Sequence, residues 1–309
     1  MEIYLPIAEI PVNMFLILAM GAAVGFLSGL FGIGGGFLLT PLLIFSGVPS
    51  AIAVATVSSQ IVASSTSGTL AHMRRKGVDL KLGLTLFAAG SVGSGIGVWV
   101  YAALRSVGQL DLVIGVIYVL MLSFVGIVML NESVRAMVAA RRGRTPVLRR
   151  PGTRGWIHRL PLKVRFRQSR LYVSIIPVLA LGAAIGFLGT LLGIGGGFIM
   201  VPALIYLLRV PTSVVIGTTL LQTLGSMAVT TILQATTNHT VDIVLGAMLM
   251  VGGVVGAQFG AQVGQRLRGE TLRALLGLLV LSVGLRFAYD LVATPSEVYS
   301  VTTLAGAGL

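Results

Sequence analysis

The chain has 309 residues, of which 55% are hydrophobic and only 10% are charged. Soluble domains carry about 25% charged residues, so this sequence has too few to cover a water-facing surface. It contains no cysteine, which excludes disulfides, thiolate catalysis and Cys-ligated metal sites. Three histidines and nine carboxylates leave little material for a metal centre, and we expect no cofactor. The composition predicts an all-α polytopic membrane protein.

The formal net charge of +13 is concentrated in loops. Twelve of the 22 Lys and Arg residues lie between Arg135 and Arg170, and four more lie between Arg74 and Lys81. A nucleic-acid-binding protein interleaves its cations with aromatic residues, whereas cations confined to loops between apolar runs are typical of the positive-inside rule. We therefore expect no nucleic-acid partner. We interpret residues 131–171 as a basic cytoplasmic linker that can also contact anionic lipid headgroups.

Ten apolar stretches follow one another along the chain, five before this linker and five after it. The first is preceded by Glu2 and Glu9 and by no cation, the reverse of a signal peptide, so we expect it to remain as a membrane segment. The second stretch of each half is shorter than the roughly 20 residues that a spanning helix needs, and begins with glycines, which predicts a short or broken helix. We expect about 8–10 membrane segments. The stretches cover approximately 12–31, 33–48, 50–71, 82–104 and 109–130, then 172–192, 194–208, 211–235, 243–265 and 271–292.

The two halves of the chain repeat one another. Residues 21–41 read GAAVGFLSGLFGIGGGFLLTP, and residues 182–202 read GAAIGFLGTLLGIGGGFIMVP. A repeat of about 110 residues has the size of a half-transporter. We therefore divide the chain into a first transmembrane repeat (1–130), the linker, a second repeat (172–293) and a tail (294–309). The equivalence extends to the pairs Thr56 and Thr218, Gln60 and Gln222, Ser64 and Ser226, Asp79 and Asp242, Gly83 and Gly246, Gly90 and Gly253, Gly93 and Gly256, and Gly97 and Gly260.

Equivalent loops of the two halves carry opposite charge bias. The loop after the third stretch has four cations in the first half and none in the second, between Thr236 and Asp242. After the fourth stretch the bias reverses, with Arg105 alone in the first half and three arginines in the second. Cationic loops stay in the cytoplasm, so the halves are expected to cross the membrane in opposite directions. This predicts two inverted-topology repeats, with the linker inside and both termini outside.

The first candidate motif is G-I-G-G-G, which occurs once in each half. Glycines expose their peptide N–H groups, and a helix that begins there directs its positive end at the gap before it. The motif can thus bind an anion without a cationic side chain. The alternative is that the glycines only permit close packing or a tight turn. The glycines assigned to substrate binding are Gly34, Gly35, Gly36, Gly195, Gly196 and Gly197.

The second candidate motif is a polar stripe on the third stretch of each half. Residues spaced i, i+4 and i+8 share one helical face, and here they are Thr, Gln and Ser in both halves. We predict that this face lines the pathway of an oxyanion; the alternative is hydrogen bonding between helices, which for the hydroxyl residues is equally compatible with the sequence. The binding residues assigned here are Thr56, Ser59, Gln60, Thr218, Thr219 and Gln222.

Two further patterns complete the sequence. Glycines recur on the fourth stretch of each half, where small residues let helices approach closely, so we interpret them as structural. Arg286 and Asp290 lie four residues apart on the last stretch and can pair with each other. No P-loop lysine motif or Ser/His/Asp arrangement is present, and we do not expect an enzyme.

The duplicated G-x-G-G-G-F-x-x-x-P, the Thr and Gln stripe after a second proline, and the basic linker between two halves resemble the TauE/SafE family of sulfite and organosulfonate exporters. The resemblance implies a secondary transporter that exports small sulfur-containing anions such as sulfite or sulfoacetate. By motif position it assigns binding to Gly34–Gly36, Gly195–Gly197, Gln60 and Gln222. The leading hypothesis is therefore anion export by alternating access. An anion channel and a non-transporting membrane scaffold that docks partners through the basic linker remain alternatives.

Overall fold

The computed structural model describes residues 2–31, 35–74, 77–141, 161–166, 168–169, 171–208, 210–264 and 269–292. Within these ranges each half consists of a two-stranded hairpin followed by five α-helices in the same order. The predominantly helical class is confirmed. The two hairpins are an addition to the all-α expectation, and β3–β4 includes residues that the sequence had assigned to the linker.

The first half begins with strands β1 (Glu2–Leu5) and β2 (Ile10–Asn13), which pair antiparallel. Its helices are α1 (Met14–Phe31), α2 (Gly36–Phe45), α3 (Ser50–Arg74), α4 (Leu80–Ser106) and α5 (Leu110–Arg141). Helix α5 continues past the expected end of the apolar stretch at residue 130, so part of the predicted linker is helical.

The second half begins with strands β3 (Lys163–Phe166) and β4 (Leu171–Ser174), also antiparallel. Its helices are α6 (Ile175–Leu192), α7 (Gly197–Tyr206), α8 (Thr212–Leu233), α9 (Ile243–Gly264) and α10 (Gly269–Val292). Helix α8 ends in a short π-helix, η2 (Gln234–Asn238), which closes on His239 in a left-handed conformation.

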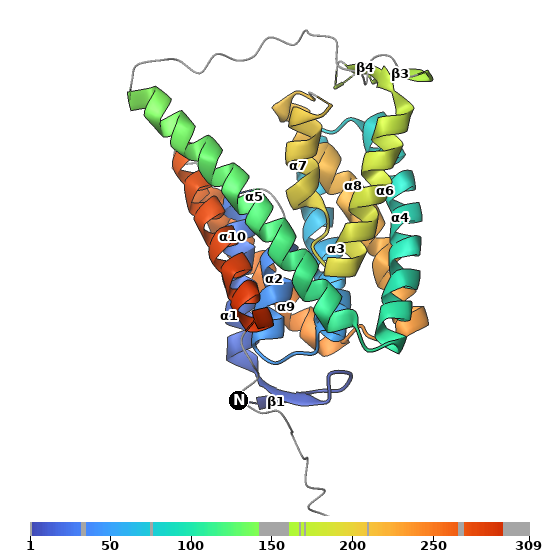
Figure 1. Cartoon of the computed structure of the whole chain (residues 1–309), viewed down its shortest axis with the longest axis vertical. Helices are drawn as coiled ribbons and strands as arrows, with labels where there is room; N and C mark the ends of the chain where they lie inside the picture. The colour runs from blue at the N-terminus through green and yellow to red at the C-terminus, as the bar shows by residue number, and fades with distance from the viewer. Residues whose placement is uncertain are drawn as a thin grey trace, which may run out of the picture.

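The two hairpins lie at opposite ends of the helical bundle (Figure 1). The β1–β2 hairpin is beside the N-terminus at the bottom of the view, and β3–β4 is at the top. Helices α5 and α10 pack side by side along one flank. The two halves therefore lie alongside each other over the length of the bundle and do not form separate lobes.

Helices of one half pack mainly against helices of the other. The closest packing joins α1 to α9 and, at the equivalent positions, α6 to α4, while α3 packs on α8 and α5 on α10. The predicted glycines make this possible. A Cβ at Gly93 would lie 2.0 Å from the carbonyl oxygen of Ala183, and one at Gly256 would lie 2.0 Å from that of Ala22. Both distances are far below a van der Waals contact, so these glycines permit backbone-to-backbone approach between the halves.

Six of the described helices contain segments long and apolar enough to cross a membrane. Helix α3 has 25 residues but carries the polar stripe, and α1 is an apolar helix of 18 residues. Helices α2 and α7 have ten residues each, as expected for the short second stretches. Ten residues rise about 15 Å, which is half of a bilayer's hydrocarbon core. The spanning segments are Leu80–Ser106, Leu110–Asn131, Ile175–Leu192, Val214–Asn238, Ile243–Gly260 and Ala274–Val292.

Candidate functional site

The second glycine motif forms a buried connection between α6 and α7. Gly193, Gly195 and Gly196 have φ angles of 66°, 70° and 71°, in the left-handed region that favours glycine. All residues from Leu191 to Phe198 are buried. In the first motif Gly35 and Gly36 are described, whereas residues 32–34, including the predicted Gly34, lie outside the described residues.

The two motifs meet at the centre of the bundle. Ile61 of α3 lies between them, because a Cβ at Gly36 would be 2.3 Å from its Cδ1 and a Cβ at Gly195 would be 2.9 Å from its Cγ2. Directly after the motifs, the rings of Phe37 and Phe198 stack with centroids 4.3 Å apart and planes 10° apart. The short helices α2 and α7 thus begin beside one another, each from its own glycine motif.

Both short helices begin without a side-chain cap. The N-cap residues are Gly35 and Gly196, whose carbonyl oxygens accept the first hydrogen bonds of α2 and α7. The first N–H groups of a helix have no partner inside that helix. They carry partial positive charge and are suited to an anion, particularly in a site without competing water.

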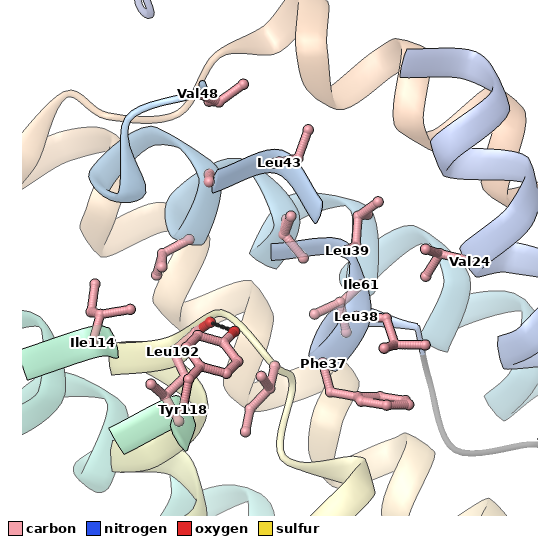
Figure 2. Packing of buried hydrophobic residues seen from close by; sticks show 14 of the residues in the cluster. Val24, Phe37, Leu38, Leu39, Leu43, Val48, Ile61, Ile114, Tyr118 and Leu192 are labelled. Carbon is pink, nitrogen blue, oxygen red and sulfur yellow. Dashed lines mark hydrogen bonds between the residues drawn. The ribbon is translucent and has the colours of Figure 1, made fainter. Parts of the chain in front are cut away.

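The first half holds the glycine connection of the second half through two hydroxyl groups. Thr40 of α2 donates to the carbonyl oxygen of Gly193 at 3.2 Å. Tyr118 of α5 donates to the carbonyl oxygen of Leu192, the bond drawn in Figure 2. The Tyr118 ring also stacks on Phe287 of α10, with centroids 5.1 Å apart. Neither hydroxyl residue is predicted from the repeat, because Thr40 stands where the second copy has Val201 and Tyr118 lies outside the duplicated segment.

The two glutamines of the polar stripe are buried but differ in their bonding. Gln222 donates from Nε2 to Ser226 at 3.0 Å, and its Oε1 accepts from Thr223 at 3.5 Å. Gln60 is 5% exposed, and its Oε1 has no hydrogen-bond partner within the described part of the chain. An unpaired buried amide oxygen is costly, and Oε1 can only accept, so Gln60 lacks the kind of donor partner that the Gln222 amide finds within its own helix.

The predicted threonines bond across the two halves. The hydroxyl of Thr56 accepts from the backbone N–H of Asp242, and that of Thr218 accepts from the N–H of Asp79, both at 3.0 Å. These bonds are of the interhelical kind that the sequence left as the alternative to a pathway lining. Both aspartates are buried.

The remaining stripe residues have unequal surroundings. Ser59 donates to the carbonyl oxygen of Thr56 at 2.7 Å, within its own helix, and a Cβ at Gly246 would lie 3.1 Å from its Oγ. Thr219 is buried, and in the described residues its hydroxyl has no partner.

Outside the stripe, Arg286 and Asp290 of α10 pair at 3.2 Å as their spacing predicts. No group of His, Asp and Glu in the described ranges is arranged to hold a metal ion.

The sequence of the chain matches a known family of membrane proteins. The family model described as "Sulfite exporter TauE/SafE" matches residues 17–287. The chain belongs to the TauE/SafE family. The match runs from helix α1 to helix α10 and so includes both halves of the chain. It confirms the resemblance seen in the duplicated motif.

Relatives of similar length carry names that agree with the TauE/SafE assignment. The chain is 25% identical over 287 residues to "Probable membrane transporter protein YunE" of Bacillus subtilis, covering 90% of this chain and 98% of that one. A "Probable membrane transporter protein" of Xylella fastidiosa is 29% identical over 279 residues, with 88% and 94% covered. "Sulfite exporter TauE/SafE family protein 5" of Arabidopsis thaliana is 44% identical over only 55 residues, 18% of this chain and 12% of that one. No solved structure matches. Family and relatives together indicate a multi-pass membrane transporter of the TauE/SafE type.

Proposed function

We propose that this transporter exports small sulfur-containing anions, sulfite or organosulfonates such as sulfoacetate, across the cell membrane by alternating access. The observation that carries the proposal is the meeting of the two glycine motifs beside Ile61 at the centre of the bundle. Two helix N-termini offer neutral hydrogen-bond donors there. The Gln60 side chain lies against Gly253 of α9, and its Nε2 is a further neutral donor on the same polar stripe. Neutral groups suit an anion that must be released again, whereas a buried arginine would hold it tightly.

Alternating access requires two halves that can move against each other, and we propose inverted-topology repeats in that role. Three observations support this: the repeated element order, the hairpins at opposite ends of the bundle in Figure 1, and the reversed charge of equivalent loops. By the positive-inside rule the basic linker is cytoplasmic and both termini are outside. The β3–β4 hairpin, which follows the linker, then marks the cytoplasmic end of the pathway.

Purified protein reconstituted into liposomes tests the proposal. Vesicles loaded with radiolabelled sulfite or sulfoacetate should release it in a protein-dependent, saturable manner, and an excess of the unlabelled anion should compete. Absence of flux for every sulfur anion, with protein that is folded and inserted, would overturn the proposal. Flux that rises linearly with concentration would indicate a channel instead.

The docking alternative is tested by shortening the segment between Arg141 and Pro161. A transporter should retain flux after this change, because none of the described helices and strands is altered. A scaffold would lose its function with the linker and tolerate bulk at the glycine motifs. The shortened linker and a bulky substitution in a glycine motif therefore have opposite effects on a transporter and on a scaffold, and together they distinguish the two functions.

A further inference from the structure

Asp79 joins three segments at one end of the bundle. Its Oδ1 accepts from the backbone N–H of Leu82 at 3.2 Å, which caps α4. Its Oδ2 accepts from both the N–H and the hydroxyl of Ser169, each at 2.8 Å. Ser169 lies in the turn of the β3–β4 hairpin, and the Asp79 side chain is 3% exposed. One buried carboxylate therefore fixes the hairpin to the start of a helix from the other half.

Asp242 makes the equivalent connections at the opposite end. Its Oδ1 accepts from the N–H of Leu245 at 3.0 Å, at the start of α9, and its Oδ2 accepts from the N–H of Ile7 at 3.0 Å. Ile7 lies in the turn of the β1–β2 hairpin, and Asp242 is fully buried. Through their own N–H groups the two aspartates also bond to Thr56 and Thr218, one helical turn before Gln60 and Gln222.

Each carboxylate thus binds the hairpin of the half to which it does not belong. Asp79 is in the first half and holds the second hairpin, whereas Asp242 is in the second half and holds the first. The two hairpins lie at opposite ends of the molecule (Figure 1), and each aspartate is therefore at the end of the hairpin that it binds. A relative movement of the halves that opens one end must break the cross-half bonds at that end and can leave the other set intact.

We propose that Asp79 and Asp242 are latches that close the two ends of the transport pathway, and that the transport cycle releases one latch at a time. Both aspartates are positioning residues, because they act through the hairpins and through the stripe threonines. The inference rests on the proposed alternating access. It adds the residues that define the closed state at each end.

Substitution of either aspartate by asparagine tests the bonds to the hairpin separately from the helix cap. Asn caps helices as well as Asp does, so its Oδ1 can still accept from Leu82 or Leu245. Its Nδ2 amide then faces a backbone N–H, that of Ser169 in Asp79→Asn and that of Ile7 in Asp242→Asn, and two donors cannot bond. The Ser169 hydroxyl can turn to accept from Nδ2, but the bond from the Ser169 N–H is lost. Ser169→Ala is a milder matched variant, because it removes one donor to Asp79 and keeps the other.

Because the chain has no cysteine, a single introduced cysteine can report how accessible the centre of the bundle is from each side of the membrane. Thr223→Cys places a single thiol beside Gly195, whose Cβ would lie 3.2 Å from the Thr223 methyl group; Thr223 itself is 4% exposed. A membrane-impermeant thiol reagent is then applied to full-length protein in right-side-out and inside-out vesicles. Labelling rates report which end is open and require no substrate.

We expect Asp79→Asn to raise the labelling rate at least about fivefold from the β3–β4 side only, and Asp242→Asn to do so from the β1–β2 side only, with Ser169→Ala intermediate on the β3–β4 side. A general loss of structure would raise labelling from both sides in each single variant, and that result would overturn the proposal, as would unchanged rates in both. Because labelling is measured without substrate, a parent protein that shows sided access but no sulfur-anion flux would refute the proposed substrate and not the latches.

Discussion

The hydroxyl of Thr56 accepts the backbone N–H of Asp242 at 3.0 Å, and the hydroxyl of Thr218 accepts the N–H of Asp79 at the same distance. Each bond joins α3 or α8 to the start of a helix in the other half. Two equivalent bonds at equivalent sequence positions indicate that the repeat preserves tertiary connections as well as helices. The stripe that carries Gln60 and Gln222 is therefore anchored at its first residue by the opposite half.

Replacing either threonine by valine tests this anchoring. Valine has nearly the same shape but leaves a buried N–H without an acceptor, which costs about 1–3 kcal/mol. We expect Thr56→Val and Thr218→Val each to lower the thermal unfolding temperature in detergent. Serine at the same positions keeps the hydroxyl and should be close to the parent. The two sites lie at opposite ends, so the double variant should show the sum of the single effects. Equal stability of the valine and serine variants would contradict the assignment.

Much of the fold is predictable because hydrophobicity and glycine spacing are local properties of the sequence. The short α2 and α7 follow directly from glycines that precede too few apolar residues. The hairpins were missed because four-residue strands give little periodicity, and Lys163 and Arg165 made β3 look like linker. The caps at Asp79 and Asp242 have a local signal, an aspartate directly before an apolar helix, but the hairpin residues that bind their second carboxylate oxygens are 90 and 235 positions away.

The candidate site was only partly predictable, for a different physical reason. Spacing places Thr56 and Gln60 on one face of a helix, but the partners of that face come from distant sequence. Thr56 bonds to a residue 186 positions away, and Tyr118 reaches a carbonyl 74 positions away. The repeat also implied equal roles for Gln60 and Gln222, whereas neighbouring hydroxyls pair with one and leave the other's oxygen unpaired.

The helix contacts predict a sharp difference between two glycines of α4. A Cβ at Gly93 would lie 2.0 Å from the Ala183 carbonyl oxygen, whereas one at Gly95 meets nothing within 4 Å. Gly93→Ala must separate α4 from α6 and should greatly reduce the yield of folded protein. Gly95→Ala should be neutral or gain up to about 1 kcal/mol from helix propensity. Size-exclusion profiles and thermal unfolding of both variants measure this; a well-folded Gly93→Ala protein would show that the helices do not pack this closely.

The two glutamines should respond differently to alanine. Gln60→Ala removes an amide whose Oε1 has no partner, so little stability should be lost. The same change removes the Nε2 donor, so the transported anion should bind about tenfold more weakly. Gln222→Ala removes the partner of Ser226 and should lower stability by about 1 kcal/mol. Anion binding by calorimetry and unfolding in detergent separate the two effects. A loss of affinity only in Gln222→Ala would reverse the assignment.

Loss of the Tyr118 hydroxyl should lower anion affinity, through the glycine connection, as well as stability. Tyr118→Phe keeps the ring stacked on Phe287 but leaves the buried Leu192 carbonyl without its donor, at a cost of about 1–3 kcal/mol. Because that carbonyl directly precedes the Gly193–Gly196 segment, we expect anion affinity to fall as well.

Tyr101→Phe is the matched control for this change. The Tyr101 hydroxyl also donates to a backbone carbonyl, that of Ala51 at 2.7 Å, but this carbonyl is in the first turn of α3 and not in the glycine connection itself. Tyr101→Phe should cost less stability in thermal unfolding than Tyr118→Phe, because the Ala51 carbonyl lies inside α3 and keeps its helical hydrogen bond, whereas Leu192 is the last residue of α6. Only Tyr118→Phe should also lose affinity and flux, since a fixed glycine segment holds its N–H donors in place for the anion. Equal affinities in the two variants would mean that the Tyr118 bond serves packing alone.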